Sequence, residues 1–448
     1  MVLIKYENMK EKIKSVSVVG LGKLGLPLSA ALASRGCHVV GIDSDSAKVQ
    51  EFNQGKFCFE PQLEDCLTLG KERLSFTTDL NQLLQTDITF VIVPTPSMAD
   101  GSFSIEYVEQ ALERIGDVLR QKNSFHVVSV VSTVLPGSME VLKAVLEKKS
   151  GKRCGQSLGL CYNPAFIALG NVIHNFLNPD FILIGESDQE SGETLEKLFI
   201  DFCTNAPAIH RMNFINAEIT KISLNTYVTM KISFGNTLAR ICEQLPGADA
   251  EVVAKALGSD SRVGPKYLRG ALGYGGPCFP RDNRAFSCMG RKVGIPAFSA
   301  EATDRVNEFQ VTWLLSLVKS YAKKEDVIGL WGLSYKPDTD VIEESQGMKL
   351  AEALINDSHP VVVYDPVAMS NSQKILGNRV SYADSALDCL RQASVLVIMT
   401  PWKEFSRFEK NQADFHDGKQ RLIIDCWQIL KGDFSSSEMK HVVLGKTL

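Results

Sequence analysis

The sequence predicts an α/β protein with two Rossmann-like domains, each a doubly wound parallel sheet, joined by a central helical region with a long helix. Three observations predict this fold. Short apolar runs alternate with helix-like segments in the first half of the 448 residues, and the same alternation returns after Glu325. Between them, residues 216–244 have a long helical character and contain no proline. We therefore expect domains at residues 1–212, 213–310 and 311–448.

The first domain is predicted from five apolar runs, each followed by small or polar residues. In open parallel sheets, the loops after the carboxyl ends of the strands bind ligands, and those loops are rich in such residues. A helix is expected directly after the first run, over residues 26–34. The expected strands are residues 16–19, 39–42, 89–93, 127–131 and 181–184.

The remainder of the chain is predicted in the same way. Residues 213–309 are expected to be mostly helical. Four later runs then indicate a second, smaller α/β domain, whose expected strands are residues 327–331, 361–364, 395–399 and 422–424. Polar or turn residues again end these strands, namely Gly332, Asp365, Thr400 and Asp425.

Composition excludes several classes of function. With 48 basic and 52 acidic residues the net charge is −4, so no strong positive field favours nucleic acid. We find no apolar run of 18 residues and no signal peptide, which predicts a cytoplasmic protein without a membrane partner. The 11 cysteines are scattered without C-x-x-C pairs or zinc spacing, so we expect thiols and no metal.

The first chemical motif is G-x-G-x-x-G at Gly20, Gly22 and Gly25, between an expected strand and helix. In this motif the first glycine makes the tight turn, the second admits a pyrophosphate and the third packs helix on strand. Asp43 ends the next strand, where a carboxylate accepts ribose hydroxyls and repels a 2′-phosphate. The motif favours NAD over NADP. The alternative is an ordinary turn whose glycines serve only packing.

The second motif is Gly-Tyr-Gly-Gly-Pro-Cys-Phe-Pro-Arg-Asp at residues 273–282. Pro280 is suited to a helix start, and a thiol just before a helix N-terminus has a lowered pKa. Such a thiolate can trap an aldehyde as a thiohemiacetal, which a second hydride loss converts into a thioester that water cleaves. Cys278 therefore predicts oxidation of an alcohol to a carboxylate. A buried structural cysteine is the alternative.

Other candidates are more ambiguous. Lys221 and Asn225 lie four residues apart on the expected long helix and share one face, where a lysine can stabilise an alkoxide. A solvated, salt-bridged lysine is the alternative. Arg262 either binds phosphate or sugar or pairs with an acid. Thr133 follows a buried strand and either positions water, binds cofactor or caps the strand.

Taken together, the motifs resemble those of the UDP-glucose/GDP-mannose dehydrogenase family, and most closely its UDP-glucose 6-dehydrogenase branch. The resemblance covers the whole chain. Besides the glycine and cysteine motifs it rests on Pro-Thr-Pro at 94–96, Ser-Thr-Val-Leu-Pro-Gly at 132–137, Ala-Glu-Ile-Thr-Lys at 217–221 and Gly-Leu-Ser-Tyr-Lys-Pro-Asp-Thr-Asp at 332–340.

The resemblance implies NAD-dependent, four-electron oxidation of the C6 alcohol of a nucleotide sugar, with UDP-glucose and UDP-glucuronate as the expected pair. It implies a homodimer or higher homo-oligomer built on the long helix, and a role in polysaccharide biosynthesis. Cys278 is the implied nucleophile, and Lys221, Asn225 and Asp282 would hold an alkoxide and a water, with Thr133 assisting. Arg262 would reach the sugar across the dimer interface.

The resemblance also implies two sets of binding residues. The cofactor set is Gly20, Gly22, Lys23, Leu24, Gly25, Asp43, Lys48, Pro94, Thr95, Thr133 and Arg281. The substrate set is Phe166, Lys221, Asn225, Arg262, Tyr267, Leu268, Gly273, Tyr274, Gly275, Phe279, Tyr335 and Lys336.

Two positions depart from the family pattern. Ala165 stands in Asn-Pro-Ala-Phe, where the family has a glutamate that assists thioester hydrolysis. An engineered change, a different base such as water held by Thr133 and Asp282, or a partial loss of activity would each explain it. Loss of a general base costs 10²–10⁴-fold, so we expect the Cys278 thioester to accumulate. Glu343 replaces an arginine and reverses a charge near the cofactor.

Three other functions stay open. The first is a dehydrogenase of another nucleotide sugar, such as a UDP-N-acetylhexosamine or GDP-mannose. The second is a single-step hydroxyacid or polyol dehydrogenase, and the third is a nucleotide-sugar-binding protein without turnover. Two, one or no NADH per substrate would separate four-electron oxidation, single-step oxidation and binding.

Overall fold

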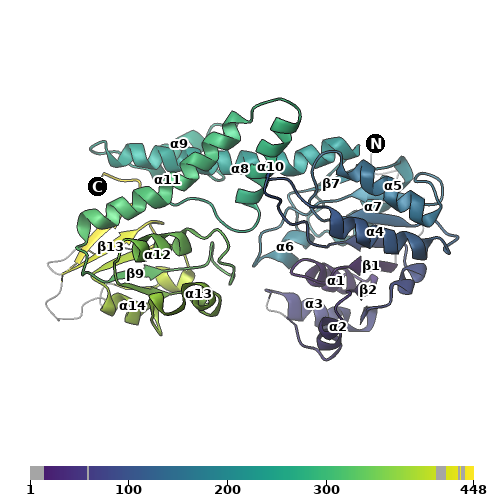
Figure 1. Ribbon diagram of the computed structural model, residues 1–448, viewed down its shortest axis with the longest axis horizontal. Helices are drawn as coiled ribbons and strands as arrows, with labels where there is room; N and C mark the ends of the chain where they lie inside the picture. The colour runs from purple at the N-terminus through teal and green to yellow at the C-terminus, as the bar shows by residue number, and fades with distance from the viewer. Residues whose placement is uncertain (1–14, 58–59, 410–419, 432–433, 435–438, 448) are drawn as a thin grey trace. The chain divides into compact units, whose positions relative to one another are not determined.

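The computed structural model describes residues 15–57, 60–409, 420–431, 434 and 439–447 (Figure 1). The chain divides into two compact units, Met1–Ile222 and Ser223–Leu448. The three-domain division expected from the sequence stays a prediction. Helix α11 (Phe298–Tyr321) runs through its second boundary at 310/311.

Unit 1 is built on an eight-stranded sheet with the order β3-β2-β1-β4-β5-β6-β7-β8. The first six strands have the Rossmann order and are parallel. The sheet comprises β1 (Ser15–Val19), β2 (His38–Ile42), β3 (Leu74–Thr77), β4 (Ile88–Val91), β5 (Val127–Val130), β6 (Gly159–Tyr162), β7 (Phe181–Glu186) and β8 (Ala208–Met212).

One pairing corrects the expectation of a wholly parallel sheet, because β7 runs antiparallel to β6, with Tyr162 opposite Gly185. The connection between them, residues 163–180, contains only the six-residue helix α6 (Val172–Leu177). The chain therefore returns to the end of the sheet that it left, instead of crossing to the other end. β8 then pairs parallel with β7.

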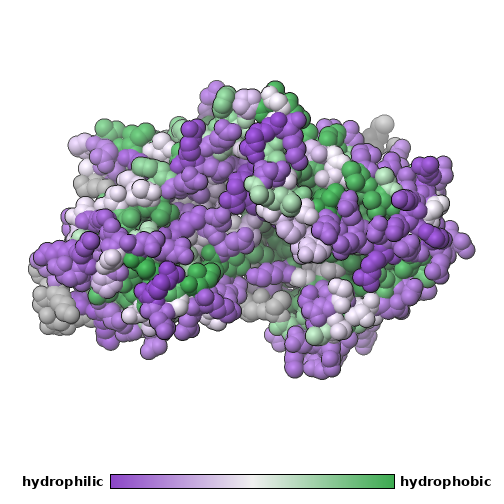
Figure 2. Space-filling model, in the orientation of Figure 1, coloured by the Kyte–Doolittle hydropathy of each residue, from purple (hydrophilic) through white to green (hydrophobic). Residues whose placement is uncertain are grey.

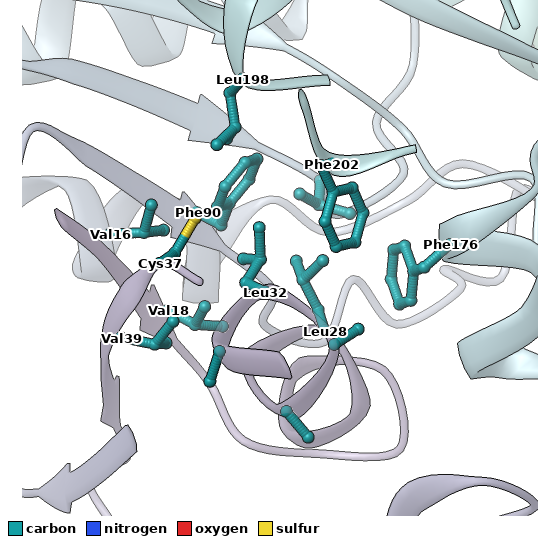
Figure 3. Close-up of a cluster of buried hydrophobic side chains, with 14 of the residues drawn as sticks. Val16, Val18, Leu28, Leu32, Cys37, Val39, Phe90, Phe176, Leu198 and Phe202 are labelled. Atoms are coloured by element: carbon teal, nitrogen blue, oxygen red, sulfur yellow. The ribbon is translucent and has the colours of Figure 1, made fainter. Parts of the chain in front are cut away.

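Helices cover both faces of this sheet. Two hydrophobic clusters, one on each face, form the core. Helix α1 (Gly25–Ser34) is apolar nearly all round, which suits a helix buried on every side. Its Leu28 and Leu32 lie among Phe90, Phe176 and Phe202 (Figure 3). The helices α6 and α7 (Gln189–Phe202) share this face, and the opposite face carries α4 (Glu106–Leu119) and α5 (Ser138–Ser150).

The expected long helix is α8 (Phe214–Glu243), whose first turns belong to unit 1. Its interior Gly235 permits a close approach, because a Cβ there would lie 2.6 Å from the Leu268 carbonyl oxygen. The other helices of the central region are α9 (Ala250–Gly258), α10 (Phe279–Lys292) and α11. The region is mostly helical, as predicted, and residues 259–278 form the loop between α9 and α10.

Unit 2 contains a second sheet, wholly parallel, in the order β11-β10-β9-β12-β13-β14. Helices α11 and α12 (Gln346–Asn356) pack on one face and α14 (Ala386–Gln392) on the other. The strands are β9 (Ile328–Trp331), β10 (Val361–Tyr364), β11 (Ser381–Tyr382), β12 (Val395–Ile398), β13 (Arg421–Asp425) and β14 (Met439–Val443). The fold is thus the two-sheet α/β class that the sequence predicts.

Hydrophilic side chains cover most of the face in Figure 2, with smaller hydrophobic patches between them. Among the described residues, no helix is both long enough and apolar enough to span a membrane.

Candidate active site

The turn between β1 and α1 has the geometry of a dinucleotide cradle. Gly20 has a φ of +95°, and a Cβ there would lie 2.1 Å from the Ile92 carbonyl oxygen. At Gly25 a Cβ would lie 1.8 Å from the Gly20 oxygen, so the helix start packs directly on the turn. A Cβ at Gly22 would meet no atom within 4 Å. The middle glycine therefore leaves open the side from which a pyrophosphate approaches, and the residues present fit a dinucleotide.

Asp43 lies at the end of β2, beside this turn. Its carboxylate accepts the amides of Leu21 at 2.8 Å and Asp45 at 3.0 Å, and the Lys48 ammonium at 2.9 Å. Burial disfavours the charge, but these donors prevail and the pKa of Asp43 lies below its usual value. An ionised acceptor thus stands where a ribose would lie. Of the other predicted residues, Leu24 immediately precedes α1 and Lys23 is exposed.

The loops after β4 and β5 are tied together. The Ser132 hydroxyl donates to the Val93 carbonyl at 2.7 Å and accepts the Val93 amide at 2.9 Å. Thr133, next in the chain, is half-buried, whereas Thr95 is buried and Pro94 exposed. These loops leave the carboxyl ends of β4 and β5, and β4 lies beside β1 at the point where the strand order reverses. Ligands bind at such switch points in open α/β sheets.

Lys221 is buried in the second turn of α8 rather than solvated. Its ammonium donates to the Ala165 carbonyl oxygen at 2.9 Å and lies 4.6 Å from the centre of the Phe166 ring. The contact with the ring is a cation–π interaction. The lysine therefore holds the loop after β6, and Ala165 takes part through its backbone alone.

The cysteine of the second motif is exposed at the start of a helix, as the sequence predicts. Cys278 immediately precedes α10, and Pro280 lies in its first turn. The Asp282 amide donates to the Cys278 carbonyl at 2.8 Å, which begins the helical pattern. The positive end of the helix dipole favours a thiolate at this position.

The segment after β9 shapes the loop before the cysteine, and both belong to unit 2. Gly276 has a φ of +80°, and a Cβ there would lie 2.5 Å from the ring of Tyr335. The Gly276 amide donates to the Glu343 carbonyl at 3.0 Å, so Glu343 acts here through its backbone. Burial, and secondly the Cys278 thiolate, raise the pKa of Tyr335. The β9 loop therefore forms one wall beside the thiol.

Three buried amide side chains, none predicted as site residues, anchor the same loop. Asn236 of α8 donates to the Leu272 carbonyl at 2.9 Å and accepts the Ala271 amide at 2.9 Å. Asn307 of α11 accepts the Tyr274 amide at 2.7 Å and donates to the Tyr274 carbonyl at 3.0 Å. Gln346 of α12 donates to that carbonyl at 3.3 Å. Carboxamides at helical positions were the available signal, but no sequence spacing connects them to the loop.

Asn225 and Asp282 lie together in the structure. The Asn225 amide donates to the Asp282 carboxylate at 2.6 Å, and both side chains are buried. The pair joins α8 to α10 within four residues of Cys278. Arg281 has its Nε 3.9 Å from the same carboxylate.

The remaining predicted substrate residues are less uniform. Arg262 is exposed and forms a two-pronged ion pair with Asp260, at 2.7 Å and 3.0 Å. Tyr267 is exposed with a φ of +68°, while Leu268 is buried. Tyr274 is buried, packs edge-on against Phe279 and donates its hydroxyl to Asp304 at 2.6 Å. Lys336 is half-buried, with its ammonium 5.9 Å from the Tyr335 ring centre.

Unit 2 repeats the turn of unit 1 with one difference. Gly332 has a φ of +102°, and its amide donates to the strand β10 as that of Gly20 does to β2, both at 2.8 Å. Asp365 then accepts the Leu333 amide at 2.8 Å, as Asp43 accepts Leu21. However, Asp365 is wholly buried and accepts six donors, from Leu333, Ser334 (amide and hydroxyl), Val367, Ala368 and Trp402. Its carboxylate therefore has no acceptor position left for a ribose hydroxyl.

Glu218 is a further residue of the site region that sequence reasoning assigned no role. It lies in α8, three residues before Lys221, and its carboxylate accepts the amides of Gly137 at 2.8 Å and Met139 at 2.7 Å. Its place inside the motif at 217–221 was the available signal.

This fold and site define a class of protein: a dinucleotide-dependent dehydrogenase with two Rossmann-type sheets and an exposed cysteine at a helix start. Three domains of one family match the chain. They are the NAD binding domain of the UDP-glucose/GDP-mannose dehydrogenase family at residues 14–203, its central domain at 215–309 and its UDP binding domain at 329–432.

Individual relatives agree with this match. The chain is 34% identical over 421 residues to UDP-glucose 6-dehydrogenase AglM of Haloferax volcanii, covering 93% of this chain and 97% of that one. It is 33% identical over 357 residues to GDP-mannose 6-dehydrogenase of Pseudomonas putida, covering 78% and 80%. A solved UDP-glucose dehydrogenase of Pyrobaculum islandicum superposes with a TM-score of 0.87 at 30% identity, covering 98% and 99%. The chain belongs to the UDP-glucose/GDP-mannose dehydrogenase family, whose members are NAD-dependent nucleotide-sugar 6-dehydrogenases.

Proposed function

We propose that this protein oxidises the C6 alcohol of UDP-glucose to the carboxylate of UDP-glucuronate, with NAD as the oxidant and Cys278 as the nucleophile. The single observation that carries the proposal is the exposed Cys278 at the start of α10. A simple alcohol dehydrogenase needs no nucleophile, whereas oxidation to the acid requires the aldehyde to be held as an adduct. The UDP binding domain match and the UDP-glucose relatives support the choice of substrate.

Bound at the β1–α1 turn, NAD would accept one hydride in each oxidation step. Gly20, Gly22 and Gly25 would receive its pyrophosphate and Asp43 its ribose, for the reasons of space and charge given above. Thr95, Thr133, Lys23 and Arg281 are further proposed contacts. The carboxylate of Asp43 supports NAD rather than NADP, because a 2′-phosphate would meet a negative charge.

The chain's own groups would act in a fixed order. The alcohol loses a hydride and a proton, and the Cys278 thiolate adds to the resulting aldehyde carbon to give the anion of a thiohemiacetal. Loss of a second hydride from this anion leaves a thioester, and water then displaces the thiolate to give the carboxylate and two protons. Lys221 and the Asn225–Asp282 pair would stabilise the oxyanion and hold the water. In total one alcohol and one water give the carboxylate, two hydrides and three protons.

The proposal is tested by mixing the protein with NAD and UDP-glucose and measuring NADH together with the intact protein mass. We expect two NADH per subunit in the first turnover and a sugar-nucleotide adduct on Cys278. The adduct should accumulate, because Ala165 has no titratable group to activate water. C278S should remove the adduct, whereas C154S, at a half-buried thiol, should leave it. One NADH per substrate and indifference to C278S would refute the mechanism.

The relatives also support a second substrate class. GDP-mannose 6-dehydrogenases match 78% of the chain at 33% identity. GDP-mannose and UDP-N-acetylhexosamines therefore belong in the same assay. Turnover of one of these with none of UDP-glucose would change the substrate while leaving the role of Cys278 intact. Binding of UDP-glucose without NADH would indicate a binding protein.

We also infer a homodimer in the cytoplasm. Exposed apolar side chains follow one face of α8, at Tyr227, Met230, Phe234 and Ile241, and just beyond its end at Leu245. The last two, with Phe309, line a groove of about 560 Å³ between α8 and α11. An apolar helical face of this kind suits a second copy of the chain. The cytoplasmic location is inferred from the sequence, whose scattered cysteines show no disulfide or zinc spacing. Sedimentation velocity tests the dimer.

A further inference from the structure

Helix α5 begins without a cap of its own. Its N-cap residue is Gly137, which has a φ of +93° and no side chain to accept the first free amides of the helix. The missing acceptor comes from α8, eighty residues later in the chain. The Glu218 carboxylate accepts the Gly137 amide through Oε2 at 2.8 Å and the Met139 amide through Oε1 at 2.7 Å. Both carboxylate oxygens are therefore engaged at one helix start.

The burial of Glu218 makes this contact unusual. The side chain is only 1% exposed, and burial raises its pKa, although the amides of Met139 and Gly137 oppose the shift. An exposed serine or aspartate at the N-cap would satisfy the Met139 amide at a lower cost in desolvation, but it would not bind the N-cap amide itself. Glu218 therefore does more than cap a helix. It joins α8 to the segment between β5 and α5.

That segment, residues 132–137, carries Thr133 and is held at three places. Ser132 bonds both backbone groups of Val93 at its start, the Val134 amide donates to the Tyr162 hydroxyl at 3.3 Å, and Glu218 holds its end. The first two contacts are to strands or strand ends of the same sheet. Glu218 connects the segment to α8, the helix that also carries Lys221.

We propose that Glu218 is a positioning residue, which fixes the 132–137 segment, and with it the Thr133 hydroxyl, relative to Lys221. Lys221 holds the loop after β6 through the Ala165 carbonyl, one helical turn after Glu218. The first two turns of α8 thus set the loops at the carboxyl ends of two neighbouring strands, β5 and β6. The assignment of a role in the reaction rests on the proposed function.

The first test measures the segment itself, independently of turnover. E218Q keeps the length of the side chain but replaces one carboxylate oxygen with an NH2 group. That group is a donor, so one of the two backbone amides loses its acceptor. Hydrogen exchange followed by mass spectrometry should show the amides of Gly137 and Met139 exchanging at least about tenfold faster than in the wild type, as expected when a charged acceptor is lost. E140Q is the matched control, because Glu140 lies exposed in the first turn of the same helix. It should leave exchange unchanged. Equal exchange in wild type and E218Q would overturn the proposal.

The second test asks whether the effect passes through Thr133. We expect E218Q to lower kcat/KM about tenfold or more, and to have little further effect in a T133A background. A purely structural loss would multiply with T133A, and that outcome would also overturn the proposal. E218D, which keeps the charge but reaches only one amide, replaces E218Q if that variant does not fold. If the wild type forms no NADH with any nucleotide sugar, the proposed function fails. In that case NADH affinity is measured for E218Q, T133A and the double variant. Effects of the two substitutions that simply add in free energy would again overturn the assignment.

Discussion

Two glycines three residues apart should respond to alanine in opposite ways. In G25A the new Cβ would lie 1.8 Å from the Gly20 carbonyl oxygen, more than 1 Å inside the closest contact that Cβ atoms make. Both partners are backbone, so neither can rotate away and α1 must shift. Overpacking costs about 1–3 kcal/mol, and we expect the upper end here. For a unit of 222 residues this lowers Tm by roughly 6–12 °C.

In G22A the new Cβ meets no protein atom within 4 Å. Stability should therefore change by no more than about 0.5 kcal/mol. The methyl group would instead occupy the approach of the pyrophosphate, so NAD affinity should fall at least about tenfold, a loss of about 1.4 kcal/mol.

Thermal unfolding without NAD and calorimetric titration with NAD separate the two effects. We expect G25A to be less stable than the wild type, and G22A to be as stable as the wild type but to bind NAD poorly. A G22A variant with wild-type affinity would refute the placement of the pyrophosphate. A G25A variant as stable as the wild type would refute the packing argument.

Two further predictions concern other parts of the chain. In G276A, a Cβ 2.5 Å from the Tyr335 ring and a φ of +80° should disturb the cysteine loop and lower the rate of Cys278 alkylation by iodoacetamide. Y335A should restore only part of that rate, because it removes the clash but not the backbone strain of about 1–2 kcal/mol; full restoration would show that strain is unimportant. Burial, and secondly Lys122, lower the pKa of His126 to about 3 from 6.5. The unfolded chain therefore binds more protons between these pH values, and stability should fall as pH drops below about 6.5, by at most about 1.4 kcal/mol per pH unit from this group. Urea unfolding at pH 7.5 and pH 5 should show a smaller loss in H126Q than in the wild type, and equal losses would contradict the assignment.

The fold was predictable where the sequence pattern has a single physical meaning. The run from β1 through Gly25 to Asp43 combines strand, turn, helix and acid, and no other structure suits that order. Buried apolar strands such as β4 and β12 were equally clear. The strands β3, β6, β8, β11 and β14 were not predicted. Four of them are only partly buried and have patterns that resemble loops. The other, β6, is wholly buried but only four residues long, and it begins at Gly159.

The reversal of β7 was also out of reach. The length of residues 163–180 is compatible with either a crossover or a return, and tertiary packing decides between them.

The sequence predicts which reactive side chains are candidates for the site, but not the residues that anchor the loops around them. Cys278, Asp282 and Asn225 stand in local motifs, and the structure pairs Asn225 with Asp282. The roles of the binding residues in the reaction stay predictions. Glu218 and Asn236 were missed because their partners lie eighty and thirty-five residues away. Local sequence patterns do not show which residues so far apart in the chain will meet.

The repeated turn of the two sheets has a consequence for redesign. Both turns place an aspartate after the second strand, yet Asp43 has three donors and Asp365 has six. If Asp43 binds the ribose, as proposed, exchanging it would alter which cofactor the protein accepts, because ligand and protein would share that carboxylate. Exchanging Asp365 would alter only how firmly the second sheet holds its loops. The same turn geometry thus contains an aspartate that can be exchanged to change ligand binding in unit 1 and one that is needed for structure in unit 2. The number of protein donors that each carboxylate accepts distinguishes the two.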